Sequence, residues 1–246
     1  MQLEGARDIT IDDSGPIGLQ FLAGDVERMP QTIESTTTVA GPSDAQLRLQ
    51  RCFDILVASI GLVVVLVPAL VFAVMIKSTS RGPILFRQDR AKRHAGTFTV
   101  YKFRTMSDGT HQAVLSDAAA RAAYRDNDYK LPPDDPRITR VGKFLRMTSL
   151  DELPQLLNVL RGQMSIVGVR PLLEEELAAR PVADQTLYRR MRPGMTGLWQ
   201  VEGRSTIRSA DRLRLDREYL EHWTFWGDVK IAFRTPFALL RIHRAH

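Results

Sequence analysis

The sequence predicts an α+β protein that is mainly helical, in which a re-entrant membrane helix hairpin, a small β-hairpin and interfacial amphipathic helices are arranged around a cytoplasmic domain. Three observations lead to this prediction. The chain has an uncharged run of 22 residues from Ile55 to Ile76. Two strand-like runs flank a basic loop at residues 84–105, and leucines recur at helical spacing from Leu153 onward.

The first part of the chain, residues 1–46, is expected to be an acidic, disordered tail. The first 50 residues hold eight Asp and Glu against three Lys and Arg, a net charge of −5, so the rest of the chain carries +11. Glycines and prolines interrupt the tail, and it has no sustained apolar period. A secretory signal is not expected, because the chain starts with neither a basic nor an apolar region. The single cysteine, Cys52, suits a reducing compartment.

The second part, residues 47–81, is predicted to enter the membrane. Its uncharged run would span about 33 Å as a straight helix, which is enough to cross the hydrocarbon core. Pro68 lies beyond the middle of the run and is expected to break the helix. We therefore expect a re-entrant hairpin that turns back at Pro68. A kinked helix that crosses the membrane, with the acidic tail outside, is the alternative.

Charged residues at both ends of the apolar run favour the hairpin. The positive-inside rule keeps basic flanks on the cytoplasmic side, and the flanking residues are Arg48, Arg51, Lys77, Arg81, Arg87 and Arg90. Asp54, at the apolar edge, is expected to reach the headgroups or to pair with a basic residue such as Arg51.

The third part, residues 82–246, begins with a predicted β-hairpin. Residues 84–88 and 97–105 have strand character, and the loop between them contains Arg90, Lys92, Arg93, His94 and Gly96. Its tip is expected to meet anionic lipid headgroups, and Lys102 and Arg104 to face a diphosphate. A solvated hairpin without these roles is the alternative. A helix at residues 113–124 is expected in the polar linker that follows.

The central stretch, residues 146–171, carries the candidate chemistry. Its leucines predict a short amphipathic helix that begins at Pro154, because proline is favoured at the first position of a helix and disfavours a helical residue before it. Asp151 and Glu152 would then lie just before the N-terminus of this helix, where unpaired N–H groups suit a phosphate or an ionised carboxylate. A capping box from Ser149 to Glu152 is the purely structural alternative.

Two adjacent carboxylates suit metal-assisted phosphoryl transfer. One can attack as a nucleophile or act as a base, while the other helps to hold a divalent cation. Nucleic acid is not expected as a partner, because nothing resembles a recognition helix or a stacking motif, and a membrane surface accounts for the basic surplus.

The sequence of the last third of the chain predicts a loop followed by two helices. Residues 192–204 are rich in glycine and arginine, which lets backbone approach a nucleotide or a sugar, although such loops are more often only turns. Helices are expected at residues 209–223 and 229–242. The aromatic residues between them, Trp223, Phe225 and Trp226, suit either a membrane interface or an ordinary core.

In this order, these features resemble one family, the bacterial sugar transferases, which are monotopic phosphoglycosyl transferases. The resemblance covers roughly residues 47–242 and is specific because its central motif is long. The sequences that carry it are FRQDRAKRHAGTFTVYKFRTM, DPRITRVGKFLRMTSLDELPQLLNVLRGQMSIVGVRP, RPGMTGLWQVEGRS and LDREYLEHWTFWGDVKIAFRT. The chain resembles the small, single-hairpin members that initiate exopolysaccharide synthesis.

The resemblance implies a reaction and a location. Members transfer a sugar 1-phosphate from a nucleotide sugar, usually a UDP-sugar, to polyprenyl (undecaprenyl) phosphate and release UMP. They work at the bacterial inner membrane, with the catalytic domain on the cytoplasmic face. The expected partners are therefore a UDP-sugar, polyprenyl phosphate, membrane lipid and downstream glycosyltransferases, together with a second copy in a homodimer. A non-catalytic membrane scaffold is the alternative.

The resemblance also implies roles for single residues. Asp151 would form a covalent aspartyl phosphosugar, and Glu152 would help to bind Mg²⁺ or Mn²⁺; direct attack by the lipid phosphate, with Asp151 only orienting it, is the alternative mechanism. The residues expected to contact phosphate or nucleotide are Arg146, Arg170, Lys102, Arg104, Gln200 and Arg204. Two positions depart from the family pattern, since Val169 replaces a common proline and Val67 replaces the serine often found before Pro68.

Overall fold

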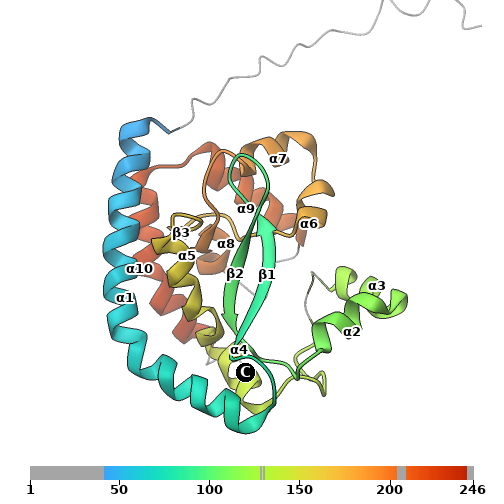
Figure 1. Cartoon of the computed structure of the whole chain (residues 1–246). Coiled ribbons are helices and arrows are strands. Elements are labelled where there is room, and N and C mark those ends of the chain that lie inside the picture. Colours follow the sequence, from blue (N-terminus) through green and yellow to red (C-terminus); the bar gives the residue numbers. More distant parts are fainter. Residues whose placement is uncertain (1–41, 128, 130, 204–208, 243–246) are drawn as a thin grey trace, which may run out of the picture. The chain divides into compact units, whose positions relative to one another are not determined.

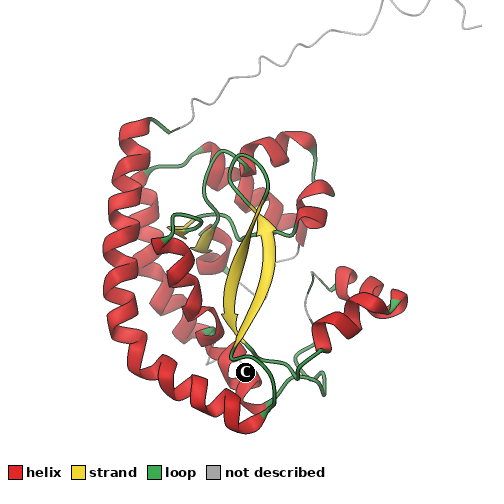
Figure 2. Cartoon of the chain, in the orientation of Figure 1, coloured by secondary structure: helices red, strands yellow, loops and turns green. Residues whose placement is uncertain are grey.

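The computed structural model describes residues 42–127, 129, 131–203 and 209–242. Within them the protein is mainly helical, with a two-stranded antiparallel sheet, a short two-stranded parallel sheet and one long apolar helix. Figure 2 shows the antiparallel sheet in the middle of this part, with helices around it. The prediction of an α+β protein that is mainly helical is confirmed. Most of the expected acidic tail, residues 1–41, lies outside the described residues.

The apolar run forms a single helix, α1 (Asp44–Thr79). Ser43 and Gln46 cap its start reciprocally, since the Ser43 Oγ accepts from the Gln46 backbone N–H and the Gln46 Oε1 accepts from the Ser43 N–H. Pro68 lies inside α1, and the helix continues past it. The predicted break into two helices at Pro68 is therefore wrong. Proline removes one helical hydrogen bond and crowds the preceding turn, which bends a helix, and Figure 1 shows that α1 bends in its second half.

One side of helix α1 packs against other described elements, and its other side is exposed. It is long and apolar enough to cross a membrane, and only 6% of its most apolar window is buried. The buried side packs Ala58 into the main core and Ile76 into a second cluster with Leu145. The exposed side is a continuous apolar surface, formed by Ile55, Leu56, Ile60, Val63, Val64, Leu66, Val67, Leu70, Val71, Val74 and Met75.

One charged residue of α1 is placed differently from the prediction. Asp54 is fully buried, and its Oδ1 accepts from the Ser165 Oγ and the Ile166 N–H, each at 2.8 Å. It therefore fixes α1 to strand β3 (Ser165–Val167) instead of reaching headgroups. Strand β3 pairs in parallel with β4 (Gly194–Thr196).

The β-hairpin is confirmed. Strands β1 (Leu85–Ala91) and β2 (Thr97–Phe103) pair antiparallel, with Leu85 opposite Phe103 and Ala91 opposite Thr97. Arg90, which was expected in the loop, is instead a buried residue of β1, and its Nη1 donates to the Pro171 carbonyl at 3.2 Å. The tip lies against protein, because the His94 N–H donates to the Arg189 carbonyl at 2.9 Å.

The remaining helices surround the hairpin. They are α2 (Thr110–Ser116), α3 (Ala118–Asp126), α4 (Arg140–Thr148), the 3-10 helix η2 (Leu150–Gln155), α5 (Leu156–Leu160), α6 (Glu174–Ala178), α7 (Val182–Tyr188), α8 (Leu198–Glu202), α9 (Ser209–Glu221) and α10 (Phe225–Ile242). The helix expected at residues 113–124 is two helices, because Asp117 adopts an extended conformation and caps α3 through the Ala120 N–H.

Helix α10 packs beside α1 (Figure 1), and Phe53 meets Phe225 edge to face at 5.9 Å. The aromatic residues of this region divide between an inward-facing ring and exposed rings, and the expected membrane interface stays a prediction. Trp223 donates its Nε1–H to the buried Asp228, whereas Trp226, Phe233 and Phe237 are exposed. The exposed rings continue the apolar surface of the protein onto α10.

Candidate active site

The two adjacent carboxylates lie on a short helical turn between two helices. Ser149 ends α4 in the left-handed conformation with φ of 59°, which is uncommon for a residue other than glycine and turns the chain into η2. Asp151 and Glu152 occupy the first turn of η2, and Pro154 lies inside it. The predicted helix start at Pro154 is therefore wrong by a few residues, since a 3-10 turn at a helix start tolerates a proline that lacks its N–H. The Ser149 side chain makes no capping hydrogen bond, so the capping box is not formed.

Glu152 is paired with a lysine from the hairpin. The Lys102 Nζ of β2 lies 2.7 Å from the Glu152 Oε1, and the two side chains are 27% and 31% exposed. Half-buried ion pairs of this kind fix orientation more than they add stability. Lys102 therefore holds one carboxylate in place beside the other, Asp151.

Burial raises the pKa of Asp151 to about 6. Lys102 and Arg146 act in the opposite direction because their positive charges favour the carboxylate, while the neighbouring Glu152 raises the pKa further. At neutral pH the carboxylate is mostly ionised, yet it is more basic than an ordinary aspartate. These are the properties of an oxygen nucleophile.

Arg146 comes from the last turn of α4. Its Nε donates to the Thr105 Oγ1 at 2.9 Å, and burial lowers the pKa of its guanidinium while Asp151 opposes that shift. The backbone of α4 approaches Thr105 closely at Gly142, where an added Cβ would overlap the Thr105 carbonyl. Three elements, β2, α4 and η2, thus bring four of the predicted site residues together.

The other predicted site residues make their contacts elsewhere. Arg104 is buried and donates from Nη2 to the Ser80 carbonyl at 2.8 Å, at the end of α1. Arg170 donates to the Glu176 Oε1 at 3.4 Å. Gln200 donates from Nε2 to the Met195 carbonyl at 3.1 Å. Arg204 lies outside the described residues. Their expected contacts with phosphate or nucleotide stay predictions.

Two residues that support the site were missed by sequence reasoning. Asn158 is fully buried, donates from Nδ2 to the Thr99 carbonyl at 2.7 Å and accepts from the Tyr101 N–H at 3.1 Å, so it fixes α5 to the strand that carries Lys102. Arg51 donates from Nη2 to the Leu160 carbonyl at 2.7 Å and so caps the end of α5. The signal that could have revealed Asn158 was an asparagine on the apolar face of a leucine-rich helix.

The carboxylate pair fits a magnesium ion that also binds substrate. Among the described residues no three His, Cys, Asp or Glu side chains come close enough to form a cation site by themselves. Mg²⁺ typically uses one or two carboxylates together with water and substrate phosphates. Asp151 and Glu152 meet that requirement when a diphosphate supplies the remaining oxygen ligands.

A buried carboxylate beside a second carboxylate and two cationic side chains is the combination that phosphoryl-transfer sites use. The family model for bacterial sugar transferases matches residues 45–242, and the protein belongs to this family.

The chain is also similar to individual members. It is 42% identical over 197 residues to a UDP-galactose-lipid carrier transferase of Erwinia amylovora, covering 78% of this chain and 40% of that protein. It is 40% identical over 190 residues to the exopolysaccharide production protein ExoY of Sinorhizobium fredii, covering 76% and 83%. It is 36% identical over 196 residues to a UDP-glucose:undecaprenyl-phosphate glucose-1-phosphate transferase of Escherichia coli, covering 77% and 39%. The chain thus spans about two fifths of the length of the first and third of these relatives.

Proposed function

We propose that the protein is a phosphoglycosyl transferase that moves a sugar 1-phosphate from a UDP-sugar to polyprenyl phosphate. The observation that carries this proposal is the convergence of Asp151, Glu152, Lys102 and Arg146 at one place. The names of the relatives support the substrates, because they refer to UDP-galactose, UDP-glucose and undecaprenyl phosphate. The reaction would start the assembly of an exopolysaccharide or a related glycan, and glycosyltransferases that extend a lipid-linked sugar would use its product.

In the first step, the Asp151 carboxylate attacks the phosphorus that bears the sugar. A new bond forms between the carboxylate oxygen and this phosphorus, the bond to the bridging oxygen breaks, and UMP leaves with the electron pair. Arg146 and Lys102 stabilise the negative charge that develops on the phosphate oxygens. A magnesium or manganese ion held by Glu152 would supply further charge neutralisation when it is bound.

In the second step, a phosphate oxygen of the lipid attacks the same phosphorus. The new bond completes a diphosphate between lipid and sugar, and Asp151 leaves as a free carboxylate. A covalent route suits a site whose nucleophile is buried, because the two large substrates then react one after the other. No proton has to be transferred in either step.

We further propose that the protein lies on the cytoplasmic face of the inner membrane, with α1 embedded as a re-entrant element. The exposed apolar side of α1 and the exposed rings of α10 support membrane embedding. The bend in the helix and the basic residues at both of its ends support a path that returns to the starting side. A homodimer is a further expectation.

The function is tested by incubating the purified protein with polyprenyl phosphate, Mg²⁺ and a panel of UDP-sugars and measuring UMP release. We expect UMP with at least one UDP-sugar, and a mass increase of the intact protein by one sugar phosphate when the lipid is omitted and the reaction is quenched quickly. Turnover without such an adduct would favour direct attack by the lipid phosphate. No release of UMP with any UDP-sugar would contradict the proposal.

The membrane path is tested by cysteine labelling in a Cys52→Ser background. Ser43→Cys and Ser107→Cys, one on each side of α1, should both resist a membrane-impermeant maleimide in intact cells and both react after lysis. Labelling of the Ser43→Cys variant from outside would show that α1 crosses the membrane. Pro68→Ala should favour that outcome, because a straight helix of this length spans the bilayer.

A further inference from the structure

Helices α2 and α3 form an arm that stands beside the hairpin, away from α1 (Figure 1). Two open hollows of about 340 and 330 Å³ lie along this arm. The two hollows share Leu115 and Arg121, so they lie next to each other, and we refer to them together as the groove. Gln88 and Asp89 of β1, Tyr124 and His111 of the arm, and Glu175 of α6 line the part next to the hairpin.

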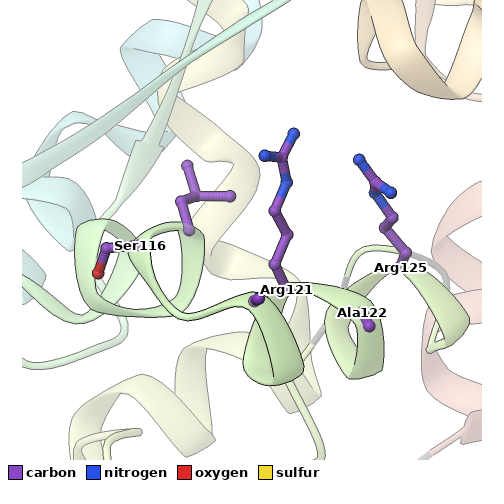
Figure 3. A pocket seen from close by; sticks show the side chains of 6 residues that line it. Ser116, Arg121, Ala122 and Arg125 are labelled. Carbon is purple, nitrogen blue, oxygen red and sulfur yellow. The ribbon is translucent and has the colours of Figure 1, made fainter.

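Two arginines of this groove share a single carboxylate. Figure 3 shows Arg121 and Arg125 extending from α3 in the same direction. Their Nη2 atoms each lie 3.3 Å from the same atom, Glu175 Oε2, and the two side chains are 46% and 49% exposed. Guanidinium groups have several donors, and one shared oxygen at this distance uses few of them. The groove therefore offers donors to a ligand with acceptor oxygens.

The groove and the carboxylate pair lie on the same face of the hairpin. Phe86 is directly opposite Lys102 in the strand register, and cross-strand partners project to one face. The ring of Phe86 contacts His111 at 5.2 Å, and His111 in turn lies 6.3 Å from the ring of Tyr124. A ligand that reaches Lys102 can therefore extend toward the arm.

We infer that the arm binds the nucleoside of the donor, with Arg121 and Arg125 donating to the carbonyl oxygens of the uracil. This inference rests on the proposed function, which places the phosphates at Lys102 and Arg146. A uracil has a flat ring that can stack on Tyr124 or His111 and has acceptor oxygens at its edge. The groove supplies partners for both features, and Glu175 occupies the arginines until the nucleoside displaces it.

A purely structural role for the same ion pairs makes a different prediction. If Arg121, Arg125 and Glu175 only hold the arm against α6, removing either side of the pair breaks the same contact. Variants of the arginines and of Glu175 would then change nucleotide binding in the same direction. If the arginines bind the nucleoside and Glu175 competes for them, the two kinds of variant change it in opposite directions.

The experiment measures the binding of UMP and of pyrophosphate to the full-length protein in nanodiscs by calorimetry. Arg121→Gln and Arg125→Gln should each weaken UMP binding about tenfold, because each removes charged donors to the ligand. Glu175→Gln should strengthen it severalfold. Pyrophosphate, which has no nucleoside, should bind all three variants as it binds the unaltered protein. Arg214→Gln, at an exposed arginine of α9 with its own ion pair to Glu218, is the matched control and should change neither ligand.

Each other result overturns the inference. Weaker UMP binding by both Arg121→Gln and Glu175→Gln would assign the pairs a structural role. Unchanged UMP binding together with a raised KM for the UDP-sugar would place the sugar, not the nucleoside, at the arm. Unchanged binding and unchanged kinetics would leave the groove without a ligand. In all three cases the unaltered protein would still release UMP, whereas failure of the proposed function would appear as no UMP release by that protein.

Discussion

Buried carboxylates with a pKa raised to about 6 occur in two regions of this protein, the turn that carries Asp151 and Glu152 and the helical body. Asp151 represents the first region, and Asp216 of α9 and Asp228 of α10 represent the second. Burial is the main cause in all three. A raised pKa therefore does not by itself mark the active site.

The difference lies in the partners. Asp228 accepts hydrogen bonds from Gln50, Tyr219 and Trp223, and Asp216 pairs with the Arg180 Nη1 at 3.0 Å. These partners tie α1, α9 and α10 into one body. Asp151 instead meets the charges of Lys102 and Arg146 beside a second carboxylate. Asp228 is held by neutral donors and Asp216 by the Arg180 guanidinium, whereas Asp151 meets two cations and is adjacent in sequence to a second carboxylate, Glu152.

The largest effect is expected at the site. Asp151→Asn keeps the shape of the side chain but removes the proposed nucleophile, so UMP release should fall at least about 1,000-fold while the melting temperature stays near that of the unaltered protein. Asp134→Asn makes the same substitution at an exposed residue and serves as the control. Near-normal turnover by Asp151→Asn would show that the carboxylate is not the nucleophile.

The opposite pattern is expected at Asp228. In Asp228→Asn the amide N–H₂ must replace either the oxygen that accepts from Tyr219 or the oxygen that accepts from Gln50 and Trp223, so at least one buried donor loses its acceptor. The free energy of unfolding should fall by about 2 to 4 kcal/mol, measured by chemical denaturation, with activity per folded molecule retained. Loss of turnover without loss of stability would instead place Asp228 in the catalytic machinery.

The raised pKa of the body carboxylate Asp216 predicts how the free energy of unfolding changes with pH. Its pKa in the folded protein is about 6, above the usual value of 3.8, so the folded state holds the proton more tightly than the unfolded state. Ionisation of Asp216 therefore costs stability as the pH rises from about 4 to 6. Asp216→Asn mimics the protonated form, so its unfolding free energy relative to the unaltered protein should increase by about 1 to 3 kcal/mol between pH 4 and pH 7. A constant difference across this range would contradict the assigned shift.

The smallest effect is expected for Glu152→Gln. The amide keeps one acceptor oxygen but loses the negative charge that attracts a cation, so the Mg²⁺ concentration for half-maximal activity should rise about tenfold. Activity at saturating Mg²⁺ should recover much of its original value. An unchanged Mg²⁺ requirement would remove Glu152 from the cation site and leave it as the partner of Lys102.

Local patterns in the sequence determined several features of this protein. The alternating residues of the two strands predicted the β-hairpin, and the long uncharged run predicted one apolar helix. The central motif pointed to Asp151 and Glu152 as candidate site residues, and its resemblance to the family added Arg146. Such features depend on hydrogen bonds and burial between near neighbours in the chain, which periodic patterns record directly.

Only the tertiary structure decided which residues meet. Lys102 pairs with Glu152 across 50 positions, while Arg104 turns to the end of α1 and Arg90 enters the core. Asp54 lies at the edge of the apolar run of α1, but a strand from a distant part of the chain covers it and supplies its hydrogen-bond donors. A charged residue has the same local sequence signature whether it binds ligand, fixes a strand or faces solvent. Its role is set by the groups that the fold brings to it from far away in the sequence.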